Sequence, residues 1–198
     1  MKRFKLIGLT GQSGAGKSTV AASLAEAGFP VIDADLLVRE LYGGGSPCLK
    51  AIAAEFGADI IKPDGTPNRP LLAERAFESA EKTALLGKLV HPFVTALLFE
   101  RLRGAEGAVI YDAPQLFESG ADVICDLVVS VVSDVELRLE RITERDGIQR
   151  EAALSRMNAQ YGEEFFRAGS DFIIENNGDL SELSKQTDRL IALLKGVL

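Results

Sequence analysis

A run of residues near the start of the chain has the composition and spacing of a phosphate-binding loop. Gly11 to Ser18 reads GQSGAGKS and matches the pattern G-x-x-x-x-G-K-[ST]. Glycine at Gly11, Gly14 and Gly16 removes Cβ crowding, so that successive backbone N–H groups can surround one anion. Lys17 adds an ammonium for the β- and γ-phosphates, and the Ser18 hydroxyl can ligate Mg²⁺. The loop therefore predicts binding of a nucleoside triphosphate together with Mg²⁺.

An aspartate later in the chain is a second candidate ligand for the metal. Asp112 ends the apolar stretch VIYD, where proteins with this loop keep a carboxylate for the metal shell. An aspartate at a strand end also commonly begins a turn or caps a helix, so both interpretations stay open. Ala15 inside the loop and Thr19 just after it complete the expected nucleotide contacts.

The segment Asp33 to Asp35, with the sequence DAD, supplies a candidate general base. It follows a short apolar stretch, and the carboxyl ends of strands in an open α/β sheet border the ligand crevice. A kinase needs a carboxylate that accepts the proton of the acceptor hydroxyl. We expect Asp33 to be that base, and Asp35 to cap the helix that follows.

Three arginines share one face of a predicted helix. Arg138, Arg141 and Arg145 are spaced i, i+3, i+7. Like charges four residues apart repel by about 0.2–0.5 kcal/mol in an isolated helix, and a polyphosphate over this face would reverse the sign. The alternative is that the arginines pair with Glu140 and Glu144. The break RDGIQRE that follows is typical of the hinge of a lid.

The elements that must position these groups alternate along the chain. Short apolar stretches predict strands at 4–10, 30–35, 107–114, 126–133 and 171–176. Helical patterns lie between them at 17–28, 36–42, 50–56, 134–145, 151–160 and 180–194. Residues 71–103 are also helical in pattern, and we expect Pro92 to begin a new helix there rather than to lie inside one.

This alternation predicts an α/β fold, a three-layer sandwich with a parallel sheet covered by helices on both faces. We expect one domain over residues 1–198. Its nucleotide-binding core would comprise 1–42, 105–135 and 165–198. A helical acceptor-binding insertion would occupy 43–104, and a lid would occupy 136–164.

Composition excludes several classes of function. The net charge of −7 does not favour a nucleic-acid binder, which needs a basic surface. Cys48, Cys125 and His91 have no metal-site spacing, and the cysteines are expected to be reduced thiols of a cytoplasmic protein. No apolar run long enough to predict a membrane span is evident. We expect small-molecule partners, with no nucleic acid and no membrane, and a monomer or weak homo-oligomer.

Three classes of protein use such a loop. A GTP switch needs N-K-x-D, but Asn176 to Asp179 reads NNGD, and DAPQ stands where D-x-x-G is needed. A motor or transporter ATPase needs more chain and further motifs. A small-molecule kinase suits the length and the helical insertion. A nucleoside monophosphate kinase, another small-metabolite kinase and a non-enzymatic nucleotide-binding module are the alternatives.

The order of the motifs resembles the dephospho-coenzyme A kinase family nearly end to end. The family opening GLTGGIGSGKST is here GLTGQSGAGKST, with Gln12, Ser13 and Ala15 as departures that remove no required glycine. The other matching motifs are DAD at 33–35, HP at 91–92, PQLFE at 114–118, R-x-x-x-R-D-G at 141–147, R-[MI]-x-x-Q at 156–160 and D-x-[VI]-I-x-N-x-G at 171–178. The loop is shared by many unrelated proteins, whereas the joint order of the other motifs is specific.

The resemblance implies ATP-dependent phosphorylation of the ribose 3′-hydroxyl of dephospho-coenzyme A. It implies that Asp33 is the general base and that Arg141 is the lid arginine on the ATP phosphates, with Arg145 beside it. Further residues are expected to contact the adenine, namely Asn176 and Gly178, or the acceptor, namely Asp35, Arg69, His91 and Gln115. Gln115 replaces a leucine of the family motif PLLFE, which puts its own acceptor contact in doubt.

Overall fold

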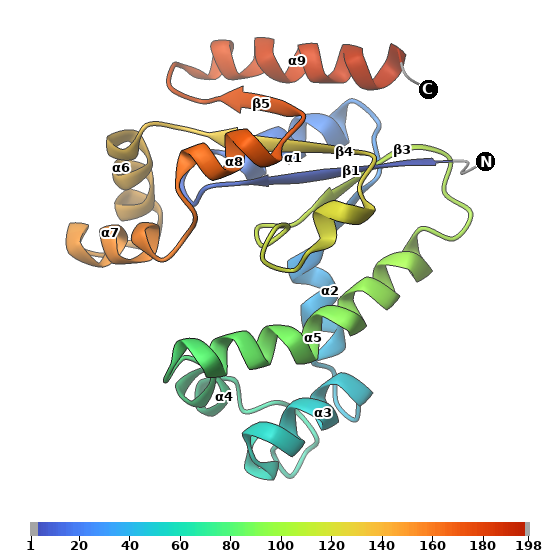
Figure 1. Ribbon diagram of the computed structural model, residues 1–198, viewed down its shortest axis with the longest axis vertical. Coiled ribbons are helices and arrows are strands. Elements are labelled where there is room, and N and C mark those ends of the chain that lie inside the picture. The colour runs from blue at the N-terminus through green and yellow to red at the C-terminus, as the bar shows by residue number, and fades with distance from the viewer. Residues whose placement is uncertain (1–3, 197–198) are drawn as a thin grey trace. The chain divides into compact units, whose positions relative to one another are not determined.

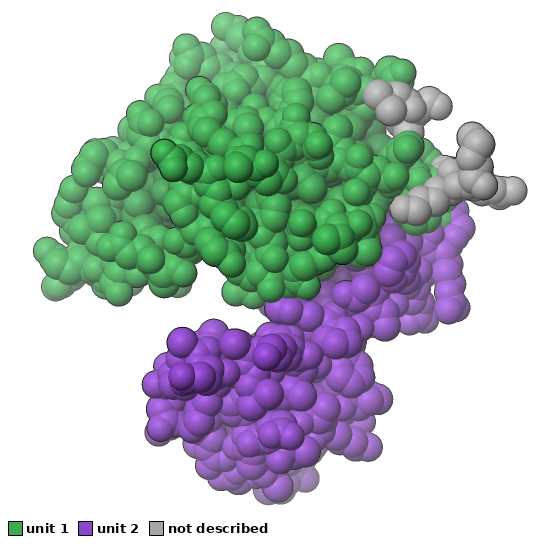
Figure 2. All heavy atoms as spheres, in the orientation of Figure 1, with its two compact units in different colours: residues 1–32, 105–198 green, residues 33–104 purple. Residues whose placement is uncertain are grey.

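The computed structural model describes residues 4–196 and divides the chain into two compact units (Figure 2). The first unit is built from the chain up to Ile32 and from Ala105 onward. The second unit is Asp33–Gly104. The helical insertion was expected to begin at residue 43, and the second compact unit begins ten residues earlier in the sequence.

A five-stranded sheet forms the centre of the first unit (Figure 1). Its strands are β1 (Phe4–Gly11), β2 (Val31–Asp33), β3 (Gly107–Asp112), β4 (Leu127–Val132) and β5 (Phe172–Glu175), in the order β2-β3-β1-β4-β5. β1 is parallel to both β3 and β4, and β4 is parallel to β5. The register pairs Leu9 with Asp112 and Gly11 with Val131. The α/β class with a parallel sheet is therefore confirmed.

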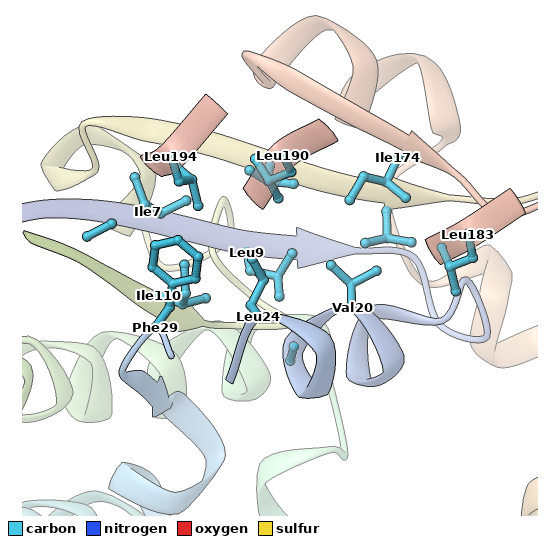
Figure 3. Packing of buried hydrophobic residues seen from close by; sticks show 14 of the residues in the cluster. Ile7, Leu9, Val20, Leu24, Phe29, Ile110, Ile174, Leu183, Leu190 and Leu194 are labelled. Carbon is cyan, nitrogen blue, oxygen red and sulfur yellow. The ribbon is translucent and has the colours of Figure 1, made fainter. Parts of the chain in front are cut away.

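Helices accompany these strands in the described part of the first unit. They are α1 (Lys17–Glu26), α6 (Val135–Asp146), α7 (Arg150–Asn158), α8 (Glu163–Gly169) and α9 (Leu180–Gly196), with a 3₁₀ turn at Ala121–Ile124. Leu9 and Ile110 of the sheet join Val20 and Leu24 of α1 and Leu190 of α9 in one cluster (Figure 3). Full burial of each such side chain contributes roughly 1.5–3 kcal/mol, which holds α1 against the sheet.

Two helices of the first unit have an apolar cluster of their own. Leu139 and Ile142 of α6 pack with Ala153 and Met157 of α7. The segment 136–164 thus contains a small helical pair stabilised by local burial, and α6 still follows directly from β4. The sequence patterns missed α8, a seven-residue helix that packs against β4.

The second unit is helical. It contains α2 (Ala34–Leu41), α3 (Pro47–Phe56), a 3₁₀ turn at Ala58–Ile60, α4 (Arg69–Ala76) and α5 (Ala80–Arg101). α5 packs against α2, α3 and α4. The hydroxyls of Ser46 and Ser79 cap α3 and α5 by accepting hydrogen bonds from backbone amides.

The prediction that a new helix begins at Pro92 is wrong. α5 runs through Pro92 without interruption. A proline inside a helix removes one backbone hydrogen bond and clashes with the preceding turn. The buried residues Val90, Val94 and Leu98 are spaced four apart on both sides of it. Burial of this continuous stripe stabilises one long helix against the local cost of the proline.

α5 also bears on the expectation that the chain lacks an apolar run of membrane-spanning length. Among the described residues, this helix is long and apolar enough to cross a membrane by length and composition alone. The expectation that no such segment exists is therefore wrong by length and composition. The helix carries charged residues such as Glu81 and Lys88, and it packs within the second unit, so this criterion is weak here.

Candidate active site

The phosphate-binding loop joins β1 to α1 as the sequence predicts. Gly14 and Gly16 have φ angles of +78° and +99°, a left-handed region that favours glycine. A Cβ at Gly14 would lie 2.7 Å from the carbonyl oxygen of Arg138, and one at Gly16 would lie 2.4 Å from Nδ2 of Asn176. Both positions therefore require glycine for conformation and for close approach.

A pocket of about 200 Å³ opens over the loop. Its walls are Gln12, Gly14, Gly16, Lys17, Ser18, Arg141 and Arg145. The structure thus brings loop residues together with two arginines of α6 that are more than 120 positions away in the sequence. Positive side chains and the N-terminal end of α1 face the same space, as an anion requires. Thr19 follows on the exposed side of α1, and its amide donates to the carbonyl of Gly16.

Lys17 forms an ion pair with Asp112 across the β1–β3 pair. Asp112 is 8% exposed, so its carboxylate is held close to the loop in a largely dry environment. Mg²⁺ in phosphoryl-transfer sites is bound by one or two protein oxygens, with phosphates and water supplying the other ligands. The Ser18 hydroxyl and the Asp112 carboxylate are oxygen donors of this kind, so the residues present are compatible with the ion.

Arg141 is positioned by protein groups. Its Nη1 donates to Oγ of Ser133 at 3.0 Å and to the carbonyl of Gly14 at 3.3 Å, and its Nη2 donates to the carbonyl of Asn176 at 3.0 Å. These bonds hold the guanidinium at the wall of the phosphate pocket. Its role on the ATP phosphates stays a prediction.

Arg145 pairs with its neighbour Asp146, with 2.7 Å between Nε and Oδ1. This bond raises the pKa of Arg145, and together with Arg156 it lowers the pKa of Asp146 to about 2. Within residues 4–196, Glu140 and Glu144 form no ion pair with the arginines of α6. The expected alternative pairing is therefore absent from the described part of the chain.

Arg138 does not share the phosphate pocket with the other two arginines. It is 4% exposed, and its Nε donates to the carbonyl of Ser13 at 2.9 Å. Burial lowers the pKa of its guanidinium, and Glu163 opposes that shift. The helix is rotated so that Arg138 faces the back of the loop, which corrects the expectation of three arginines over one polyphosphate.

Two polar residues, one in the loop and one beside it, were given no role from the sequence. Oε1 of Gln160 accepts a hydrogen bond from the amide of Ser13 at 3.0 Å, and the R-[MI]-x-x-Q motif was its only signal. Gln12 is 4% exposed, and its Oε1 has no hydrogen-bond partner among the described residues. Gln12 lines the phosphate pocket, so a ligand or water there can satisfy this oxygen.

Asn176 lies at the end of β5 and is buried, with an exposed fraction of 7%. Its Nδ2 donates to the carbonyl of Ala15 at 2.8 Å, and its own carbonyl accepts from Oγ of Ser133 at 2.7 Å. The side chain is therefore turned toward the loop. Gly178 is exposed beside it, and the contact of both residues with adenine stays a prediction.

Asp33 is the N-cap of α2, which corrects the assignment of that role to Asp35. Oδ1 of Asp33 accepts from the amides of Asp35 at 2.7 Å and of Leu36 at 3.1 Å. The backbone of Asp33 is extended, as an N-cap requires, because it is the last residue of β2. Asp35 is exposed in the first turn of the helix.

The expected acceptor-side residues are divided between the units. Arg69 lies over the ring of Tyr42, 5.8 Å from its centre, and burial raises the pKa of Tyr42 to about 12. His91 lies half-buried on α5, where burial lowers its pKa. Both belong to the second unit together with Asp33 and Asp35, whereas Gln115 is exposed in the first unit just after β3.

Glu118, in the same segment as Gln115, was not singled out from the sequence. Burial raises the pKa of its carboxyl group. The segment that follows β3 therefore holds a carboxyl group with a perturbed pKa, although nothing in the PQLFE motif by itself predicts that perturbation.

Comparison with known proteins agrees with these features. The family model described as dephospho-CoA kinase matches residues 5–182. A dephospho-CoA kinase of Corynebacterium efficiens is 42% identical over 190 residues, which cover 94% of this chain and 95% of that protein. The family model and this relative therefore both match most of the chain.

Two solved structures share the arrangement of the elements. The Thermus thermophilus protein TT1252 has 33% sequence identity and a TM-score of 0.82, with 98% of this chain and 99% of that chain covered. A dephospho-CoA kinase from Campylobacter jejuni has 26% identity and a TM-score of 0.72, with 98% and 100% covered. The loop, the DAD segment and the R-x-x-x-R-D-G and R-[MI]-x-x-Q motifs lie within the residues that the family model matches, and the chain belongs to the dephospho-CoA kinase family.

Proposed function

We propose that this protein transfers the γ-phosphoryl group of ATP to the ribose 3′-hydroxyl of dephospho-coenzyme A, giving coenzyme A and ADP. The observation that carries the proposal is the family match over residues 5–182, which contains the loop, the Lys17–Asp112 pair and the capped Asp33. A nucleoside monophosphate kinase is not favoured, because the relatives that match over nearly the whole chain are dephospho-CoA kinases.

Catalysis in this reaction rests on position and charge. The loop amides and the ammonium of Lys17 bind the phosphates, and Arg141 and Arg145 approach from α6 to neutralise the charge of the transferring group. Because the phosphoryl group passes through a loose transition state, donors held in place before reaction lower the barrier without reorganisation. The α6–α7 pair then excludes water from the transfer.

Asp33 accepts the proton of the 3′-hydroxyl in this proposal. Its Oδ1 is held by two amides of α2, whereas its Oδ2 has no hydrogen-bond partner among the described residues. The cap therefore fixes the orientation of the carboxylate and leaves one oxygen for the proton. This division explains how the last residue of β2 can serve structure and chemistry together.

Mg²⁺ would be held by Ser18 and Asp112. When bound, it would neutralise negative charge on the phosphates. Lys17 has to release Asp112 in part, since the same carboxylate now pairs with its ammonium. The ammonium is then available to the phosphates.

Asp35, Arg69, His91 and Gln115 are proposed to contact the acceptor. Arg69 offers a guanidinium for its diphosphate, which is the kind of group that binds such anions well. Thr19, Asn176 and Gly178 complete the nucleotide side. The net charge of −7, together with two cysteines that have no metal-site spacing, supports a cytoplasmic protein, monomeric or weakly self-associating, with small-molecule partners rather than nucleic acid or membrane.

An acceptor panel tests the proposal. Purified protein with Mg-ATP should release ADP when dephospho-coenzyme A is added, and mass spectrometry should show one added phosphoryl group on the product. AMP, CMP and shikimate serve as competing acceptors. Turnover only with a nucleoside monophosphate would establish the alternative kinase, and tight nucleotide binding without turnover on any acceptor would indicate a binding module.

A further inference from the structure

Two carbonyl oxygens of the phosphate-binding loop accept hydrogen bonds from side chains that do not line the pocket. Arg138 Nε donates to the carbonyl of Ser13 at 2.9 Å, and Asn176 Nδ2 donates to that of Ala15 at 2.8 Å. The donors come from α6 and from the end of β5, and both are at least nine-tenths buried. Their positions are therefore set by the fold rather than by solvent.

The peptide bond couples each carbonyl to the next amide. Because the peptide group is planar and trans, its C=O and N–H point in opposite directions. A fixed carbonyl at Ser13 therefore sets the direction of the Gly14 amide, and a fixed carbonyl at Ala15 sets that of the Gly16 amide. Within the described residues, these two amides have no hydrogen-bond acceptor.

The amide of Ala15, between those of Gly14 and Gly16, does have a hydrogen-bond acceptor. The N–H of Ala15 donates to the carbonyl of Gln12 at 3.0 Å, which closes a turn inside the loop. Arg141 contacts the carbonyl of Gly14 only at 3.3 Å. Among the consecutive amides of Gly14, Ala15 and Gly16, the two without an acceptor in the described residues are thus those whose peptide groups Arg138 and Asn176 hold.

We propose that Arg138 and Asn176 are positioning residues for the nucleotide, holding the Ser13 and Ala15 carbonyls so that the Gly14 and Gly16 amides are oriented for a phosphate before it binds. Arg138 and Asn176 also approach the two glycines closely, which leaves no room for a side chain at either position. A Cβ at Gly16 would lie 2.4 Å from Nδ2 of Asn176, and a Cβ at Gly14 would lie 3.1 Å from Cα of Arg138. The inference rests on the nucleotide site of the proposed function and does not require its acceptor.

Two substitutions at Arg138 isolate the hydrogen bond. Glutamine places its Nε2 at the same distance along the side chain as Nε of arginine, so Arg138→Gln retains a donor and loses the charge. Methionine ends in a methyl group at that place, so Arg138→Met loses both. Because the two variants remove similar volume and the same charge, they differ chiefly in the donor.

The measurement is the dissociation constant of Mg-ADP by titration calorimetry. Arg138→Gln should stay within about twofold of the parent protein. Arg138→Met should bind about fivefold more weakly than Arg138→Gln, the factor that loss of one net hydrogen bond predicts. Arg150→Met, which removes an exposed arginine of α7, is the control and should leave the constant unchanged.

Steady-state kinetics separate orientation from general damage. The KM for ATP should rise in Arg138→Met while the KM for dephospho-coenzyme A stays within about twofold. Asn176→Leu removes the other donor at similar size, and it should likewise raise the KM for ATP and leave the KM for dephospho-coenzyme A nearly unchanged. It replaces Arg138→Met as the test if that variant does not fold. Equal ADP affinity in Arg138→Gln and Arg138→Met, whether normal or weakened, overturns the role of the Arg138 donor. Unchanged affinity in Asn176→Leu overturns that of Asn176.

ADP binding requires no acceptor, so these results stand apart from the acceptor panel. If the chain bound Mg-ADP normally but failed to phosphorylate dephospho-coenzyme A, the proposed function would be wrong. The Mg-ADP affinities of the Arg138 and Asn176 variants would still test the positioning roles.

Discussion

Asp33 carries two roles that one substitution can separate. Its Oδ1 caps α2 through the amides of Asp35 and Leu36, and its carboxylate is the proposed general base. Asparagine retains a side-chain oxygen that caps helices as well as aspartate does. It cannot accept the proton of an alcohol. Asp33→Asn should therefore fold normally and turn over slowly, whereas Asp33→Ala should lose both properties.

The magnitudes follow from these contacts. Loss of an N-cap side chain costs about 1 kcal/mol, which for a chain of this size lowers the melting temperature by roughly 2–4 °C. Loss of a general base reduces turnover by about 10²–10⁴-fold. We expect Asp33→Asn to show the full kinetic loss with little change in melting temperature. Asp33→Ala should show both effects.

The assay is ADP release under saturating Mg-ATP and dephospho-coenzyme A, together with thermal unfolding of each variant. Ser79→Ala is the matched control, because it removes the N-cap of α5 in the same unit and touches no proposed reacting group. It should lose melting temperature and retain kcat. Turnover of Asp33→Asn within about threefold of the parent would refute the base role, since the cap alone would then account for the aspartate.

Three further predictions concern the loop and a histidine. Gly16→Ala should weaken Mg-ADP binding more than tenfold, because a Cβ there would meet the Asn176 side chain and Gly16 has a φ of +99°. The control is Gly104→Ala, at a φ of +78° with open space around it, which should lower stability by the left-handed strain of about 1–2 kcal/mol and leave binding unchanged. An equal loss of binding in both variants would contradict this prediction. Lys17→Met should weaken nucleotide binding at least tenfold by calorimetry, the loss expected of a charge-assisted bond, and parental affinity would exclude the phosphate contact. Burial lowers the pKa of His91, so the unfolded chain binds the proton more readily; stability present above about pH 6.5 should fall on acidification, and His91→Gln should flatten the melting temperature between pH 7 and pH 5.

Much of the fold follows from local patterns. The run Phe4 to Thr10 is apolar and ends in a glycine loop, and it forms β1 with one further residue. The helix predicted from Lys17 begins at that residue and ends two positions before Gly28. Strand and helix patterns are properties of neighbouring residues, so these elements could be read without knowledge of what they contact.

The errors arose where distant residues decide the outcome. Pro92 lies inside α5 because Val90, Val94 and Leu98 are buried on both sides of it. The arginines of α6 share a spacing, but the rotation of the helix against the loop turns Arg138 toward Ser13 instead of the pocket. Spacing within a helix gives relative directions only, and packing sets the absolute one.

By itself the sequence determined the chemistry of this protein, because a phosphate-binding loop requires glycines, a lysine and a hydroxyl in one short continuous segment. The tertiary structure alone decided which distant side chains serve that loop. The carbonyl partners of Ser13 and Ala15 lie 125 and 161 positions away along the chain. Such contacts depend on the packing of whole elements, and a buried hydrogen bond between distant residues leaves no regular spacing in the sequence.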